Sequence, residues 1–182
     1  MEVDKKKEHG KYILDITREW ISNVDVKISI LLAFVGIIFG YIFIESDSEI
    51  FIKVINSINN RNITSLKLIK GSMIVLTHIS SLITILSLLN ALRAKINIKK
   101  FKENGITINS IIFYGNIASM NYNEYKKKVD NQTDESFIND IYSQAYITSM
   151  ICTKKFKYYN IGIYMTIVSL SLLITSKVTG VL

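Results

Sequence analysis

The 182-residue sequence contains no proline, one cysteine and two histidines. Without proline, no segment carries the residue that most strongly interrupts helices. The single cysteine, Cys152, excludes an internal disulfide and any cysteine-rich metal site. His9 and His78 lie far apart in the sequence and form no ligand cluster, so no metal site is predicted.

The sequence also lacks the patterns of common enzyme classes. It has no Ser/His/Asp arrangement, no phosphate-binding glycine loop, no metal-ligand spacing and no conspicuous carboxylate pair. We therefore predict a protein that is not an enzyme, with no catalytic residue and no cofactor. The net charge of +7 raises the alternative of a nucleic-acid polymer as partner. The favoured explanation of the positive charge is that the cations flank membrane spans and attract anionic lipid.

Hydrophobic residues make up 49% of the chain, and the mean hydropathy is +0.28. This apolar content is clumped into three stretches, Val26 to Ile44, Ser72 to Leu92 and Asn160 to Ser176. Each is close to the length of roughly 20 residues that a helix needs to cross a bilayer. The prediction is an all-α membrane protein with about three transmembrane helices and long helices that extend into a small cytoplasmic helical region.

Lysine and arginine near the span ends predict the orientation. Eleven lie on one side and five on the other. The first set is Lys11, Arg18, Lys27, Arg93, Lys95, Lys99, Lys100, Lys102, Lys154, Lys155 and Lys157, and the second is Lys53, Arg61, Lys67, Lys70 and Lys177. The larger set is assigned to the cytoplasm of a multi-pass protein of the cell inner membrane, which places the N-terminus there as well. The predicted segments are a cytoplasmic N-terminal helix (1–25), span one (26–45), an external loop (46–70), span two (71–92), a cytoplasmic sensor region (93–157), and span three with a C-terminal tail (158–182).

Two long helices are predicted to connect the cytoplasmic part with the membrane. One runs from about residue 11 into span one. The other begins near Asp134, interpreted as an N-cap, and continues for about 40 residues, or roughly 60 Å, into span three.

Small and hydroxyl-bearing residues mark two of the spans. Gly36 and Gly40 of span one have the spacing of a close helix contact, either within the chain or between subunits. Span two carries a polar seam, Thr77, Ser80, Ser81, Thr84, Ser87 and Ala91. Such a seam favours close helix packing, with a hydrophilic pore lining as the alternative.

Charged residues gather at the cytoplasmic ends of the spans. Asp25 and Lys27 point nearly opposite ways on a helix and cannot pair with each other. Arg93 and Lys155 end the neighbouring segments. Two interpretations stay open: a structural bridge from Asp25 to one cation, or an anion site that receives a phosphate. Tyr114, Asn116, Gln144 and Tyr146 are the side chains expected to frame a base or ribose.

The order of these segments resembles the transmembrane effectors of bacterial Pycsar anti-phage systems. The resemblance covers about residues 12 to 175 and is carried by "REWISNVDVKISILLAF", "ALRAK", "IFYGNIASM" and "DIYSQAYITSMICTKKFKYYNIGIY". The chain departs from the family pattern at Ala94, where proline is frequent, and at Asn116, where histidine is frequent.

The resemblance implies a sensor of cyclic UMP or cyclic CMP, made by a partner cyclase, that impairs the inner membrane and stops phage propagation. Lys27, Arg93 and Lys155 would hold the phosphate, Asp25 would orient these cations, and the protein would form a homo-oligomer in the lipid bilayer. Two rival functions remain: a ligand-independent small channel or holin-like pore, and a membrane anchor for a soluble partner.

Overall fold

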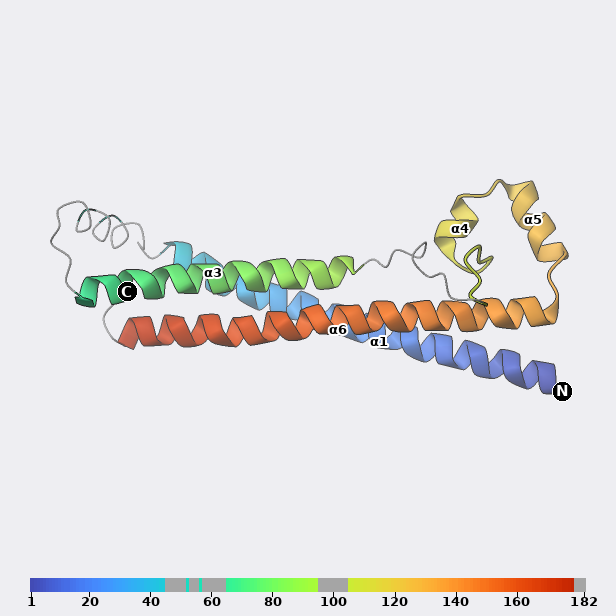
Figure 1. Ribbon diagram of the computed structural model, residues 1–182, viewed down its shortest axis with the longest axis horizontal. Coiled ribbons are helices and arrows are strands. Elements are labelled where there is room, and N and C mark those ends of the chain that lie inside the picture. The colour runs from blue at the N-terminus through green and yellow to red at the C-terminus, as the bar shows by residue number, and fades with distance from the viewer. Residues whose placement is uncertain (45–51, 53–55, 57–64, 95–104, 179–182) are drawn as a thin grey trace. The chain divides into compact units, whose positions relative to one another are not determined.

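The computed structural model describes residues 1–44, 52, 56, 65–94 and 105–178 (Figure 1). Within these ranges the regular elements are all helices and no strand occurs, so the predicted all-α fold is confirmed. The helices are α1 (Glu2–Ile44), α3 (Ser65–Arg93), α4 (Tyr114–Ala118), α5 (Tyr122–Asp130) and α6 (Asp134–Val178).

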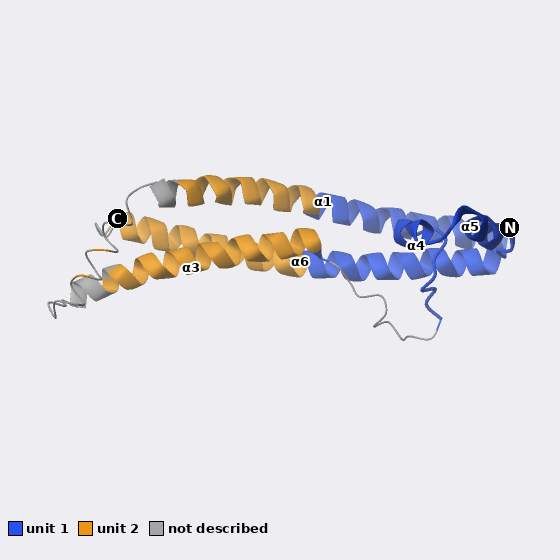
Figure 2. Cartoon of the chain, turned by 90° about the horizontal axis from the view of Figure 1, so that it is seen from above, with its two compact units in different colours: residues 1–24, 94–155 blue, residues 25–93, 156–182 orange. Residues whose placement is uncertain are grey.

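The chain divides into two compact units, coloured separately in Figure 2. Unit 1 comprises residues 1–24 and 94–155, and unit 2 comprises residues 25–93 and 156–182. Helices α1, with 43 residues, and α6, with 45 residues, each contribute to both units. The two predicted long helices are therefore present, and α1 begins at Glu2, well before residue 11.

The start of α6 corrects the predicted capping residue. The side-chain oxygen of Thr133 accepts a hydrogen bond from the amide of Ser136 at 3.2 Å, and its carbonyl accepts from Phe137 at 3.0 Å. Thr133 is thus the N-cap, because a capping oxygen satisfies an amide of the first turn. Asp134 is instead the first helical residue, where its charge complements the positive end of the helix dipole.

Three helices, α1, α3 and α6, have segments long and apolar enough to cross a membrane, as the sequence predicted. Unit 2 contains α3 and the parts of α1 and α6 from Asp25 and from Phe156 onward. In α3 the distribution of polarity is inverted relative to a water-soluble bundle. From Val75 to Leu89 its exposed side chains are all apolar, namely Val75, Leu76, Ile79, Leu82, Ile83, Leu86 and Leu89, while exposed Asn90 and Arg93 lie at its end. Its buried side includes Thr77, Ser80, Ser81, Thr84 and Ser87. This inversion suits a helix whose outer surface faces hydrocarbon.

Unit 1 is held by the packing of α1 against α6. Leu14, Ile141 and Ala145 form a buried apolar cluster. Gly10 brings the helices close together, since a Cβ added there would lie 3.1 Å from Ile141 Cγ2. Two further contacts fix the crossing: the hydroxyl of Tyr142 donates to the carbonyl of Lys6 at 3.3 Å, and Lys7 Nζ lies 4.9 Å from the ring centroid of Phe137.

The Gly10→Leu substitution should destabilise unit 1 by about 1–3 kcal/mol, because a larger side chain overpacks the α1–α6 contact. Thermal unfolding in detergent would measure the loss. Glu8→Leu is the control, since it places the same side chain at an exposed position of the same helix. Equal melting temperatures for the two variants would contradict this account of Gly10.

Candidate functional site

The segment from Gly105 to Phe113 is fastened to α6 by polar side chains on one face of that helix. Asn139 donates to the carbonyl of Gly105 at 3.0 Å and to the hydroxyl of Thr107 at 3.1 Å. The hydroxyl of Ser143 accepts from the Thr107 amide at 2.9 Å. Since Asn139 and Ser143 are four residues apart on a helix, both reach the same stretch of chain.

Asp140 holds the next part of this segment from inside. Its Oδ2 accepts the amide of Ile111 at 2.9 Å, and only 1% of the residue is exposed. The other carboxylate oxygen, Oδ1, is buried without a hydrogen-bond partner. The completely buried hydroxyl of Ser110 accepts from the amides of Ile112 and Phe113, both at 3.1 Å. The chain is thus turned into α4 by buried polar contacts, while Ile108 is 45% exposed.

The glycine of the "FYGN" stretch, Gly115, is explained by a close approach of a neighbouring ring. A Cβ added at Gly115 would lie 2.7 Å from Cε1 of the Phe113 ring. Asn116 then reaches back, with its amide nitrogen donating to the carbonyl of Ile108 at 2.7 Å. One donor of Asn116, a predicted ligand-binding residue, is therefore used in shaping this turn.

The remaining predicted ligand-binding residues of unit 1 differ in exposure. Tyr114 is 79% exposed and Tyr146 is 44% exposed, so both present aromatic surface. Gln144 and Lys155 are buried, at 7% and 6% exposure. The set therefore offers two accessible rings, an amide and an ammonium group from one compact unit.

The other predicted site residues, Asp25, Lys27 and Arg93, belong to unit 2. Lys27 and Arg93 are exposed, and Asp25 is half-buried. The chain passes between the units at Val24–Asp25, at Arg93–Ala94 and at Lys155–Phe156. Each passage is within three residues of one of the predicted phosphate-binding cations.

Comparison with known proteins agrees with this architecture. The family model of the Pycsar effector protein domain matches residues 9–181. The chain is 31% identical over 171 residues to the Pycsar effector protein GmPycTM of Gulbenkiania mobilis, which covers 90% of this chain and 87% of that protein. The chain belongs to the Pycsar effector family. No solved structure gives a significant match.

Membership identifies a transmembrane effector of an anti-phage system. In this Pycsar effector the glycine pair of span one is not used for packing inside the described part of the chain. A Cβ added at Gly36 or Gly40 would meet no neighbouring atom within 4 Å. By contrast, the predicted seam of span two is buried from Thr77 to Ala91, in agreement with the close-packing interpretation.

Sequence reasoning missed Asn139, Asp140 and Ser143. Their spacing of i, i+1 and i+4 was available, but on a helix with a polar face such residues are usually solvated. One signal was available in the sequence: several polar residues fall on the same side of α6 as the apolar residues Ile141 and Ala145. Polar residues on a packed side need hydrogen-bond partners. Only the docked segment shows what they bind.

Asp140→Ala should weaken the attachment of residues 105–113 by about 1–3 kcal/mol, because the buried amide of Ile111 loses its acceptor. Asp140→Asn should cost less, since one side-chain oxygen remains available to that amide. Hydrogen exchange at Ile111, followed by mass spectrometry or NMR, would measure the difference. Asp130→Ala, at the exposed end of α5, is the control. Unchanged exchange in Asp140→Ala would contradict the assigned role.

Proposed function

We propose that this Pycsar effector is activated by a cyclic nucleotide, cyclic UMP or cyclic CMP, made by a partner cyclase, and then impairs the inner membrane to stop phage propagation. The observation that carries the proposal is the family membership. It is supported by the coincidence of the predicted cations with the three passages of the chain between the units.

In the proposed site, Lys27, Arg93 and Lys155 bind the cyclic phosphate. Charge-assisted bonds to phosphate oxygens are stronger than neutral hydrogen bonds. The low exposure of Lys155 favours it in this role, because an ion pair is stronger where water is excluded. Asp25 orients the cations.

The base or ribose is framed by the aromatic and amide residues of unit 1. Tyr114 and Tyr146 offer exposed rings on which a base can stack. Gln144 and Asn116 offer hydrogen bonds to its edge. Because Asn116 already donates to Ile108, a base would use its carbonyl oxygen or its second amide hydrogen.

Helices α1 and α6 transmit the signal, since each is one uninterrupted helix with residues in both units. The nucleotide shifts the protein to an active state only by binding that state more tightly than the resting one. The N-terminus is cytoplasmic in this proposal, and no catalysis is involved. Subunits associate through the face of α1 that contains Gly36 and Gly40, where small residues leave room for another helix.

Lys27→Ala and Arg93→Ala should each reduce nucleotide affinity about tenfold or more, the effect of losing a hydrogen bond to a charged group. Both should also abolish nucleotide-dependent killing while leaving membrane insertion intact. Cell survival with an induced cyclase, together with membrane fractionation, would measure these outcomes. Lys126→Ala, on an exposed position of α5, removes the same charge elsewhere and should still kill. Killing by both site variants would place the site elsewhere.

Calorimetry of the detergent-solubilised protein against a panel of cyclic mononucleotides and dinucleotides separates the proposal from its rivals. Saturable heat with cyclic UMP or cyclic CMP supports the proposal. Toxicity on expression without any cyclase would favour the ligand-independent pore. Copurification of a soluble partner that is lost on deletion of residues 105–130, with no depolarisation under any condition, would favour the anchor.

A further inference from the structure

The interior of unit 2 contains hydroxyl groups that we call the hydroxyl seam. Its members are all buried in the resting structure. They are Thr77, Ser80, Ser81, Thr84 and Ser87 of α3 and Thr166 and Ser169 of α6. Buried polar groups are costly in a membrane unless they are hydrogen-bonded, so the bonding of the seam determines how firmly it is closed.

Many of these hydroxyls are satisfied by their own helix. Thr77 donates to the carbonyl of Met73 at 2.9 Å, Thr84 to that of Ser80 at 3.0 Å, and Thr166 to that of Gly162 at 2.8 Å. These bonds do not depend on the neighbouring helix. They would survive a separation of α3 from α6, which keeps the polar cost of separation small.

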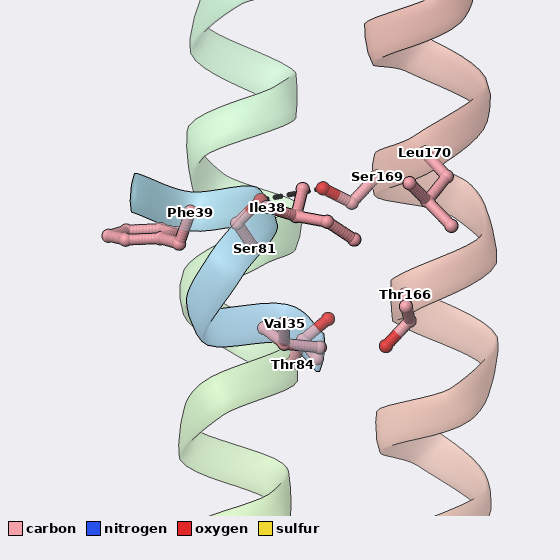
Figure 3. Close-up of a pocket in the computed structure, with 8 residues that line it drawn as sticks. All are labelled: Val35, Ile38, Phe39, Ser81, Thr84, Thr166, Ser169 and Leu170. Carbon is pink, nitrogen blue, oxygen red and sulfur yellow. Dashed lines mark hydrogen bonds between the residues drawn. The ribbon is translucent and has the colours of Figure 1, made fainter. Parts of the chain in front are cut away.

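Two contacts join the helices directly. The hydroxyls of Ser81 and Ser169 lie 2.6 Å apart and point toward each other, as Figure 3 shows. Gly162 lies against Leu88, because a Cβ added at Gly162 would be 2.5 Å from Leu88 Cδ2. Ser81 contacts Ser169, and the later residue Leu88 contacts the earlier residue Gly162. The two helices are therefore antiparallel and closely packed over this stretch.

Around Ser81 and Ser169, α1 covers the seam. Val35, Ile38 and Phe39 line a cavity of about 10 Å³ together with Ser81, Thr84, Thr166 and Ser169, and Ile38 points toward α6 (Figure 3). The cavity has roughly the space of one water molecule. No continuous aqueous route passes through so small a space. Between Val75 and Leu89 the exposed side chains of α3 are all apolar. Along this stretch the hydroxyls of the seam, with half-buried His78, are therefore the polar side chains that α3 can turn toward a hydrated route.

We propose that the hydroxyl seam is the closed form of the permeation route and that activation parts α3 from α6, which lets water and small ions reach these hydroxyls. The inference rests on the membrane impairment proposed above and names the surface that produces it. The competing surface is the outer face of α6, where Tyr164, Ser171 and Thr175 are exposed.

The first test locks the seam reversibly. Ser81→Cys and Ser169→Cys are combined with Cys152→Ser in the full-length protein, so that the introduced pair holds the only thiols. Hydroxyls 2.6 Å apart are positioned for a disulfide, whose sulfurs are separated by about 2.05 Å. The protein in dye-loaded liposomes is oxidised with copper phenanthroline and exposed to cyclic UMP or cyclic CMP.

We expect the oxidised variant to bind nucleotide in calorimetry and to release no dye, and dithiothreitol to restore release. Release that persists after complete oxidation, verified by loss of free thiols, would overturn the seam proposal. Absence of nucleotide binding in the reduced, unlocked protein would instead count against the proposed function. The seam proposal would then be decided by the next two tests, which do not depend on nucleotide binding.

The second test opens the seam without nucleotide. Gly162→Ala places a Cβ against Leu88, and we expect an approximately tenfold increase in basal dye release, the size of an overpacking effect. Val75→Ile, which also adds one carbon but at an exposed position of α3, is the control. Equal basal release from properly inserted Gly162→Ala and wild-type protein would contradict the proposal.

The third test asks which surface becomes wet. In the Cys152→Ser background, Thr84→Cys and Ser171→Cys are treated with a charged thiosulfonate reagent before and after activation, with Gly162→Ala added to activate the protein if nucleotide does not. The thiol introduced by Thr84→Cys should be protected from the reagent before activation and should react at least about tenfold faster after it. Such an increase is expected if activation shifts the population toward an open state. Labelling of Ser171→Cys alone would assign the route to the outer face of α6.

Discussion

Hydrocarbon gives membrane helices no hydrophobic reason to stay together, so the spans of this Pycsar effector must be held by close packing and hydrogen bonds. The contact of α3 with α6 meets this requirement with small side chains. Gly162 admits Leu88, and Ser81 and Ser169 share a hydrogen bond. A larger residue at either helix would separate the backbones and remove the contacts that hold the spans.

The same constraint explains why the hydroxyls lie inside. A helix in lipid can turn apolar side chains outward at no cost, while serine and threonine must find partners, and several find them in their own backbone. Such self-bonded hydroxyls fill space between helices without binding the helices to each other. Among the described residues, Ser81 and Ser169 add a direct bond between α3 and α6 to this packing.

Unit 1 is built on another principle. There an apolar cluster of α1 and α6 is combined with a segment fastened by Asn139, Asp140 and Ser143. The buried carboxylate of Asp140 uses one oxygen to hold Ile111 and leaves the other without a partner. Because an unsatisfied buried oxygen costs free energy, the docked segment is less stable than it would be with both oxygens bonded. Helices α1 and α6 each continue from unit 1 into unit 2.

Much of the molecule follows from the sequence by local rules. Runs of apolar residues without proline determine three spans, and uninterrupted helical spacing determines that α1 and α6 extend beyond them. The family pattern also lies in the sequence, because it is an ordered set of local motifs. Tertiary structure decided the rest. Gly10 and Gly162 are needed where a second helix approaches, and Asp140 is buried only because a distant segment docks on it. Such contacts join residues far apart in the chain, so no local spacing reveals which polar or small residue meets a partner.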